Sequence, residues 1–161
     1  MKNKSQSSRL AALILSGGIS FVAFAAIAAS PRSQESKPPA QRLAASNTAK
    51  FDTVSKADAT YNGALDAHDL DGAYKKIGQK SAFRGTVSKV FETRDGDLVI
   101  LDFDAQYRTA LTAVLKSPDF GKFPDLGGLD GKEVVVSGTF VDYQGKAQIV
   151  LTEPAQIKIV K

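Results

Sequence analysis

The feature that most constrains the fold is a change of hydrophobic periodicity after Lys80. From Phe83 onward large apolar residues alternate with polar ones, a pattern typical of half-buried β-strands. Val90 breaks the phase by one residue before Phe91, and such a slip indicates a β-bulge that bends the strand. The C-terminal half of the chain is therefore expected to form a bent β-sheet.

Four further strands are predicted after the bent one. The Arg94-Asp95-Gly96-Asp97 segment, with Asp-Gly at its centre, is typical of a hairpin turn, and Tyr143–Lys146 forms a second turn. A longer connection at 117–131 contains two prolines and four glycines and has room for one helical turn. The apolar segment 157–160 closes the chain. The strands are expected at residues 98–103, 111–115, 134–140 and 147–151.

One short helix is expected before the strands. Asp69 is a suitable N-cap for residues 70–76, and Gly78 follows as a C-terminal stop. The predicted fold is all-β, a small closed five-stranded barrel preceded by this helix. An open five-stranded sandwich is the alternative.

The N-terminal residues 1–29 have the features of an export segment. Lys2, Lys4 and Arg9 precede a 20-residue stretch at 10–29 without an ionisable side chain, which ends in small residues. This arrangement is typical of a secretory signal peptide, and the same stretch is about long enough for an uncleaved membrane anchor. The protein is therefore expected to be exported, periplasmic or secreted, or else anchored to the membrane through this segment.

A spacer is expected to separate this segment from the folded domain. Residues 30–56 are rich in proline, serine and alanine, and such a composition buries too little apolar surface to offset the entropy of ordering. The domain is expected to span residues 57–161, and residues 51–63 form a weakly ordered approach to it.

Composition excludes several classes of site. The chain has no cysteine and one histidine, which excludes disulfide scaffolds, thiolate zinc sites, cysteine nucleophiles and multi-histidine metal centres. The formal net charge of +4 depends on the N-terminus, because 18 basic and 17 acidic residues remain without Lys2, Lys4 and Arg9. The basic balance is therefore no evidence for nucleic-acid binding.

Three stretches, at 78–90, 101–114 and 129–157, resemble bacterial exported OB-fold domains of the nucleic-acid-binding type. The most distinctive part is the turn at Tyr143-Gln144-Gly145-Lys146, the strand after it and the Pro154-Ala155-Gln156-Ile157 ending. The resemblance covers roughly residues 69–161. It implies a barrel with a binding face on its second and third strands and the nearby loops, and it implies no specific ligand.

Aromatic and basic residues near the implied face are the candidate ligand-binding groups. Single-stranded nucleic acid is held by aromatic platforms beside a positive groove. For the aromatic rings, burial in the core is the alternative role, and the alternating positions of Phe83, Phe103 and Phe140 are equally well explained by the core. The candidates are Arg84, Lys89, Phe91, Arg94, Tyr107, Arg108 and Tyr143.

Acidic residues offer weaker candidates for chemistry. Asp102 and Asp104 flank Phe103, and a metal-dependent nuclease would need them to converge with Glu92. Hydrogen bonding at a strand end explains the two aspartates better. The acids around His68 do not match an EF-hand loop and are better explained by helix capping.

The leading hypothesis is a non-enzymatic exported binding module for single-stranded nucleic acid, without a cofactor. The alternative is a module that binds an envelope protein or a glycan through the same face. A nuclease is the third hypothesis. A continuous positive groove through Arg84, Lys89 and Arg108 would support only the first of these.

Overall fold

The computed structural model describes residues 48–161, in which β-strands predominate over short helices. These residues form nine strands, whereas the sequence predicted five. Three of the additional strands are β1, β2 and β9, and the fourth arises because the bent strand is divided into β3 and β4. The six strands of the central curled sheet are β3 (Lys80–Thr86), β4 (Lys89–Glu92), β5 (Leu98–Asp102), β6 (Thr112–Lys116), β7 (Glu133–Tyr143) and β8 (Lys146–Leu151).

The phase slip predicted near Val90 corresponds to the break between β3 and β4. At this break Val87 exchanges hydrogen bonds with the segment before β7, donating to Lys132 O (2.9 Å) and accepting from Gly131 N (2.9 Å). The next residue, Ser88, donates to Asp102 O in β5. The chain thus changes partners at the break, because β3 pairs antiparallel with β7 and β4 pairs antiparallel with β5.

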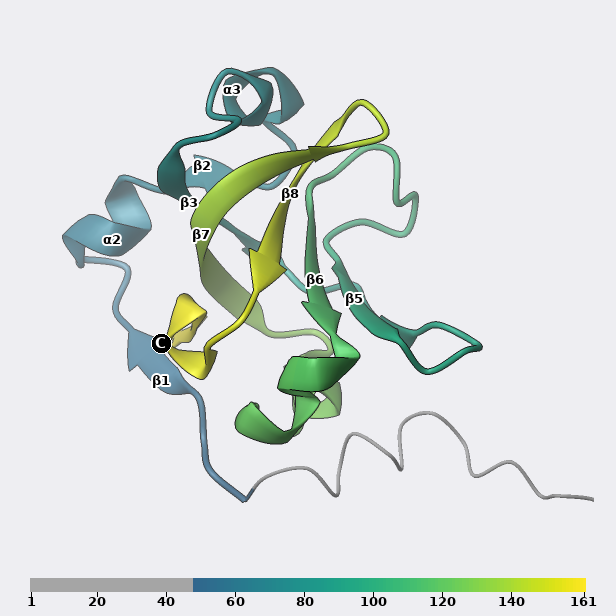
Figure 1. The fold of residues 1–161 in the computed structure, drawn as a ribbon. Helices are drawn as coiled ribbons and strands as arrows, with labels where there is room; N and C mark the ends of the chain where they lie inside the picture. Colours follow the sequence, from purple (N-terminus) through teal and green to yellow (C-terminus); the bar gives the residue numbers. More distant parts are fainter. Residues whose placement is uncertain (1–47) are drawn as a thin grey trace, which may run out of the picture. The chain divides into compact units, whose positions relative to one another are not determined.

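The sheet is strongly curled into a half-barrel, and Figure 1 shows how far β7 bends across it. Its strand order is β4-β5-β6-β8-β7-β3, in which β6 and β8 are parallel and the other pairs antiparallel. The two end strands, β3 and β4, are consecutive in the chain. The predicted hairpin turn at 94–97 is confirmed, with Gly96 at a φ of +71°.

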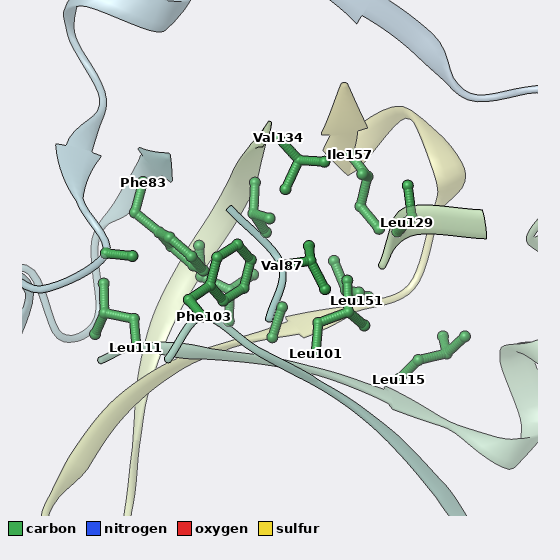
Figure 2. Packing of buried hydrophobic residues seen from close by; sticks show 14 of the residues in the cluster. Phe83, Val87, Leu101, Phe103, Leu111, Leu115, Leu129, Val134, Leu151 and Ile157 are labelled. Atoms are coloured by element: carbon green, nitrogen blue, oxygen red, sulfur yellow. The ribbon is translucent and has the colours of Figure 1, made fainter. Parts of the chain in front are cut away.

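The core fills the inside of the curl. Phe83 lies edge-on to Phe103 with ring centroids 4.9 Å apart, and its centroid is 6.1 Å from that of Phe140. Figure 2 shows Phe83 and Phe103 among the aliphatic side chains of neighbouring strands. All three rings are buried, so the core role is the correct one for them. Their alternating positions are the sequence signal that predicted it.

The segment before β3 covers part of the outside of the curled sheet. Strand β1 (Asp52–Val54) pairs parallel with β9 (Ile157–Val160), and β2 (Leu65–Asp66) pairs parallel with β3. Helix α2 (Ala59–Asn62) lies between them in sequence. Val54 and Ala64 pack here against Val135 of β7 in a small second hydrophobic cluster.

This cover corrects the predicted domain boundary. Strand β1 lies within the segment 30–56 that was expected to be disordered, and it is ordered by pairing with the last strand of the chain. Residues 51–63, expected to be weakly ordered, contain β1 and α2. The predicted export segment and residues 30–47 lie outside the described residues. Within 48–161, no helix is long and apolar enough to cross a membrane.

The predicted short helix is α3 (Leu70–Tyr74), which ends two residues earlier than expected. Asp69 caps it, with its Oδ1 accepting from Gly72 N at 2.9 Å. Helix α3 packs against β8 and β7. The connection between β6 and β7 contains two 3₁₀ helices, η1 (Ser117–Lys122) and η2 (Leu126–Leu129), and η3 (Pro154–Gln156) precedes β9.

Candidate binding face

Alternation along the strands gives the curled sheet an outer face over β4, β5, β6 and β8. In β5, Val99 and Leu101 are buried in the core, and the alternate residues Leu98, Ile100 and Asp102 are half-buried and point outward. Register then aligns the outward side chains in two rows. The polar row is Lys89, Asp102, Thr112 and Gln148, and the apolar row is Phe91, Ile100, Val114 and Val150.

The polar row begins with a cation beside an aromatic ring. Lys89 Nζ lies 5.5 Å from the ring centroid of Phe91, whose side chain is 42% exposed. Asp102 is the register partner of Lys89. Partial burial raises the pKa of Asp102, and the positive charges of Lys89 and Lys146 oppose that shift. The face therefore combines an exposed ring, a lysine and a partly desolvated carboxyl group.

A second aromatic group lies at the rim of the face, which we define as Tyr107, Arg108, Tyr143 and Lys146. Tyr107 lies between β5 and β6 and is 55% exposed. Lys146 Nζ lies 4.7 Å from the Tyr107 ring centroid, and the Arg108 guanidinium carbon lies 5.4 Å from it. These contacts bring two cations to one exposed ring.

Hydrogen bonds hold this rim together. Arg108 Nε donates to Tyr107 Oη at 2.9 Å, and Lys146 Nζ donates to Tyr107 O at 2.8 Å. The β7–β8 hairpin places Lys146 opposite Tyr143, which is 56% exposed. Two segments separated by 39 residues in sequence thus form one rim.

A shallow hollow of about 170 Å³ borders the rim. Its walls come from α3, the β7–β8 turn and the start of β6, and they include Tyr74, Thr112 and Lys146. Small-molecule sites usually enclose ~300–1,000 Å³. The hollow is smaller, so it suits the edge of an extended ligand lying on the surface better than an enclosed small molecule.

Five of the seven predicted site residues border this face. Lys89 and Phe91 lie on it, and Tyr107, Arg108 and Tyr143 form the rim. Arg94 lies in the exposed turn between β4 and β5, beyond the end of β4.

Arg84 is not brought to the outer face. Its Nη1 donates to Tyr61 O (2.8 Å) and Ala64 O (3.2 Å), and its guanidinium carbon lies 4.6 Å from the Tyr61 ring centroid. Arg84 therefore fastens the segment around α2 to β3. The continuous groove through Arg84, Lys89 and Arg108, which would have supported the nucleic-acid hypothesis alone, therefore does not form.

Sequence reasoning missed Lys146, Thr112 and Gln148. Lys146 was identified as part of the hairpin turn but not as a site residue. The two-residue turn at Gln144-Gly145 sets the register that places Lys146 beside Tyr143, so hairpin geometry was the available signal. Nothing local indicated Thr112 or Gln148, because their alignment with Asp102 depends on pairing between distant strands.

The acids of the nuclease hypothesis do not converge. Glu92 is buried, and Asp102 lies on the outer face. Asp104 Oδ2 lies 3.0 Å from His68 Nε2, and His68 Nδ1 lies 3.1 Å from Asp66 Oδ1. No group of three or more His, Asp or Glu side chains with a metal-binding arrangement occurs among residues 48–161.

The His68 contacts shift the pKa values of all three groups. The hydrogen bonds to Asp104 and Asp66 raise the pKa of His68 above its ordinary value. The pKa of Asp66 is lowered, first by the backbone N–H of His68, and the pKa of Asp104 is lowered, first by the backbone N–H of Gln106. The trio links the segment before α3 to the loop that carries Tyr107.

No family model and no curated protein matches the chain. Among solved structures, it is similar to OBody AM1L10 bound to hen egg-white lysozyme, at 21% identity and a TM-score of 0.38, over 53% of this chain and 81% of that one. It is also similar to aspartyl tRNA synthetase from Entamoeba histolytica, at 11% identity and a TM-score of 0.45, over 70% of this chain. The match spans only 25% of the synthetase. Both TM-scores are too low to define the fold family or the ligand of this chain.

Proposed function

We propose that the chain is a non-enzymatic binding module that holds single-stranded nucleic acid along the outer face and rim. The observation that carries this proposal is the rim, where the exposed Tyr107 ring lies within 5.5 Å of both Arg108 and Lys146. Stacking of a base on an aromatic ring beside cations that meet the phosphates is the general mode of binding single strands. Phe91 with Lys89 provides a second pair of the same kind.

The strand order supports the further inference that the barrel is of the OB type. We treat β3 and β4 as one interrupted first strand, so that β5 and β6 become the second and third. OB-folds bind ligands on these two strands and on the loops beside them. Phe91, Tyr107 and Lys146 border that region.

Charge limits the strength of this binding. Residues 48–161 carry 15 basic and 16 acidic side chains, so only a local concentration of cations can attract phosphate. Lys89 and Lys146 provide positive charge near Asp102, and Arg108 adds a third cation beside Tyr107. With about three phosphates neutralised, the logarithm of the affinity should fall with the logarithm of salt concentration with a slope of about −2.

The proposed setting is outside the cytoplasm, from the features of residues 1–29. Expressed in an exporting bacterial host, the mature protein should begin near Ala29 or Ser30. Mass spectrometry of the envelope and secreted fractions measures this directly. If the protein in the membrane fraction retains residues 1–29, the segment is an uncleaved anchor and not a signal peptide.

A protein partner is the second candidate function, and the apolar row favours it. Phe91 is exposed, Ile100 and Val150 are half-buried, and the row crosses four strands. Large apolar side chains in such a row can anchor a peptide without phosphate contacts. Binding of this kind would be nearly independent of salt, whereas phosphate binding is not.

The function test is fluorescence anisotropy with labelled single-stranded oligonucleotides and the full-length chain in mild detergent. Replacing Tyr107 with alanine should weaken binding about 5- to 100-fold, as expected for loss of one stacked base, and leave the melting temperature nearly unchanged. Arg108→Ala should reduce the salt slope by about 0.7. The matched control is Lys80→Ala, which removes an exposed cation from β3 and should leave the slope unchanged.

Two results would contradict the proposal. The parent chain binding no oligonucleotide at low salt would exclude the nucleic-acid function. A Tyr107→Ala variant with unaltered affinity and a lowered melting temperature would make the Tyr107 ring a structural element of the rim.

A further inference from the structure

The centre of the outer face carries polar side chains that make no hydrogen bond to any group of residues 48–161. Asp102, Thr112 and Gln148 are register partners on three adjacent strands, and all three point outward. Among residues 48–161, no group donates a hydrogen bond to these side chains or accepts one from them. No lysine or arginine within this range forms an ion pair with Asp102 at 4.0 Å or less.

In this row, Asp102 is the ionisable group whose side chain is partly buried without a hydrogen-bond donor from residues 48–161. Asp102 is half-buried within the polar row, and burial raises its pKa. A partly desolvated carboxylate without a donor loses hydrogen bonds to water and gains no hydrogen bond in their place. Lys89 and Lys146 act on it only through their charge. An N–H donor from a ligand would therefore restore hydrogen bonds that the carboxyl group has lost.

The Asp102 carboxyl group lies on the same face of the sheet as the exposed ring of Phe91. Phe91 pairs with Ile100, and Asp102 is two residues further along the same face of β5. The two side chains are therefore diagonal neighbours, which in antiparallel sheets lie roughly 7–8 Å apart. A base stacked on Phe91 can extend its edge toward Asp102 over such a distance.

We infer that Asp102 is a base-reading residue that selects guanine for the position stacked on Phe91. This inference rests on the proposed function. A carboxylate accepts two parallel hydrogen bonds from N1–H and the N2 amino group of guanine, the two adjacent donors of its Watson–Crick edge. Adenine and cytosine present one amino group beside a ring nitrogen that accepts. Thymine presents one N–H between two carbonyls, which repel a carboxylate.

The experiment compares a short oligothymidine with the same oligomer carrying one central guanine, bound to the full-length chain in mild detergent. The guanine oligomer should bind about tenfold more tightly, a typical discrimination for a bidentate base contact. An oligomer with hypoxanthine at the centre keeps N1–H and lacks the amino group. It should bind with an intermediate affinity.

Replacing Asp102 with asparagine should abolish the preference for guanine, because the amide NH₂ faces the guanine donors with a donor of its own. Asp95→Asn is the matched control, since it removes the same charge from the exposed turn beyond β4. This control should retain the tenfold ratio.

The outcomes separate the two proposals. If all oligomers bind the parent chain equally, the guanine inference is wrong and the nucleic-acid function stands. If the ratio persists in Asp102→Asn, another residue reads the base and the inference is also wrong. If no oligomer binds at low salt, the proposed function fails, and the guanine inference fails with it.

Discussion

Replacing Arg84 with methionine tests whether this residue stabilises the fold or binds a ligand. Methionine keeps most of the apolar stem and removes the guanidinium group. The substitution deletes two hydrogen bonds, to Tyr61 O at 2.8 Å and Ala64 O at 3.2 Å, and a cation–π contact with the Tyr61 ring at 4.6 Å.

The expected loss of unfolding free energy follows from these contacts. A hydrogen bond from a charged donor contributes ~1.5–3 kcal/mol when buried, and these two are partly buried, with one of them long. A cation–π contact near the surface adds ~0.5–1 kcal/mol. We therefore expect a loss of about 2–4 kcal/mol, a large share of the ~5–15 kcal/mol that stabilises a typical domain.

Urea denaturation followed by circular dichroism measures this loss on the full-length chain. Lys80→Met is the matched control on the same strand, and its exposed side chain should change the unfolding free energy by less than ~0.5 kcal/mol. Oligonucleotide affinity should be unchanged in Arg84→Met. An Arg84→Met protein with parental stability and clearly reduced affinity would refute the structural role derived for Arg84.

Two further predictions concern packing and pH. Gly138→Val should lower the free energy of unfolding by about 2 kcal/mol or more in thermal or urea unfolding, because a Cβ there would lie 2.7 Å from Ile149 Cγ2. A variant of parental stability would show that β7 shifts freely to admit the side chain. The stabilisation that His68 gains from its contacts with Asp66 and Asp104 should be fully present below the ordinary histidine pKa of about 6.5. It should be lost as the pH rises through the raised pKa of the folded protein. An NMR titration of His68 should therefore give a higher midpoint in the parent than in Asp104→Asn, and equal midpoints would contradict the bridging geometry.

Elements with local causes were predictable from the sequence. The N-cap at Asp69, the hairpin turn containing Gly96 and the alternating core positions of Phe83 and Phe140 follow from neighbouring residues. In each case the physical cause lies within a few residues of the chain, as a capping side chain, a positive φ or a two-residue period. The phase slip near Val90 likewise located a real interruption, although not the change of strand partner behind it.

Elements with distant causes required the tertiary structure. Strand β1 has a short, mixed sequence and is ordered because it pairs with β9 at the other end of the chain. Arg84 looked like a free cation in the sequence, but its acceptors lie 20 and 23 residues away, on carbonyl groups that only the folded segment around α2 presents.

The binding face shows the same division. Composition already showed that cations must be concentrated locally to attract phosphate, whereas the apolar run 98–101 before Asp102 does not alternate and gave no indication of which side of β5 faces outward. Only the parallel pairing of β6 with β8 aligned Asp102 with Thr112 and Gln148, and only the curl of the sheet brought Lys146 to Tyr107 across 39 residues. Side-chain direction is a local property of the backbone, whereas the neighbours that a side chain meets depend on which distant strands pair and in which register.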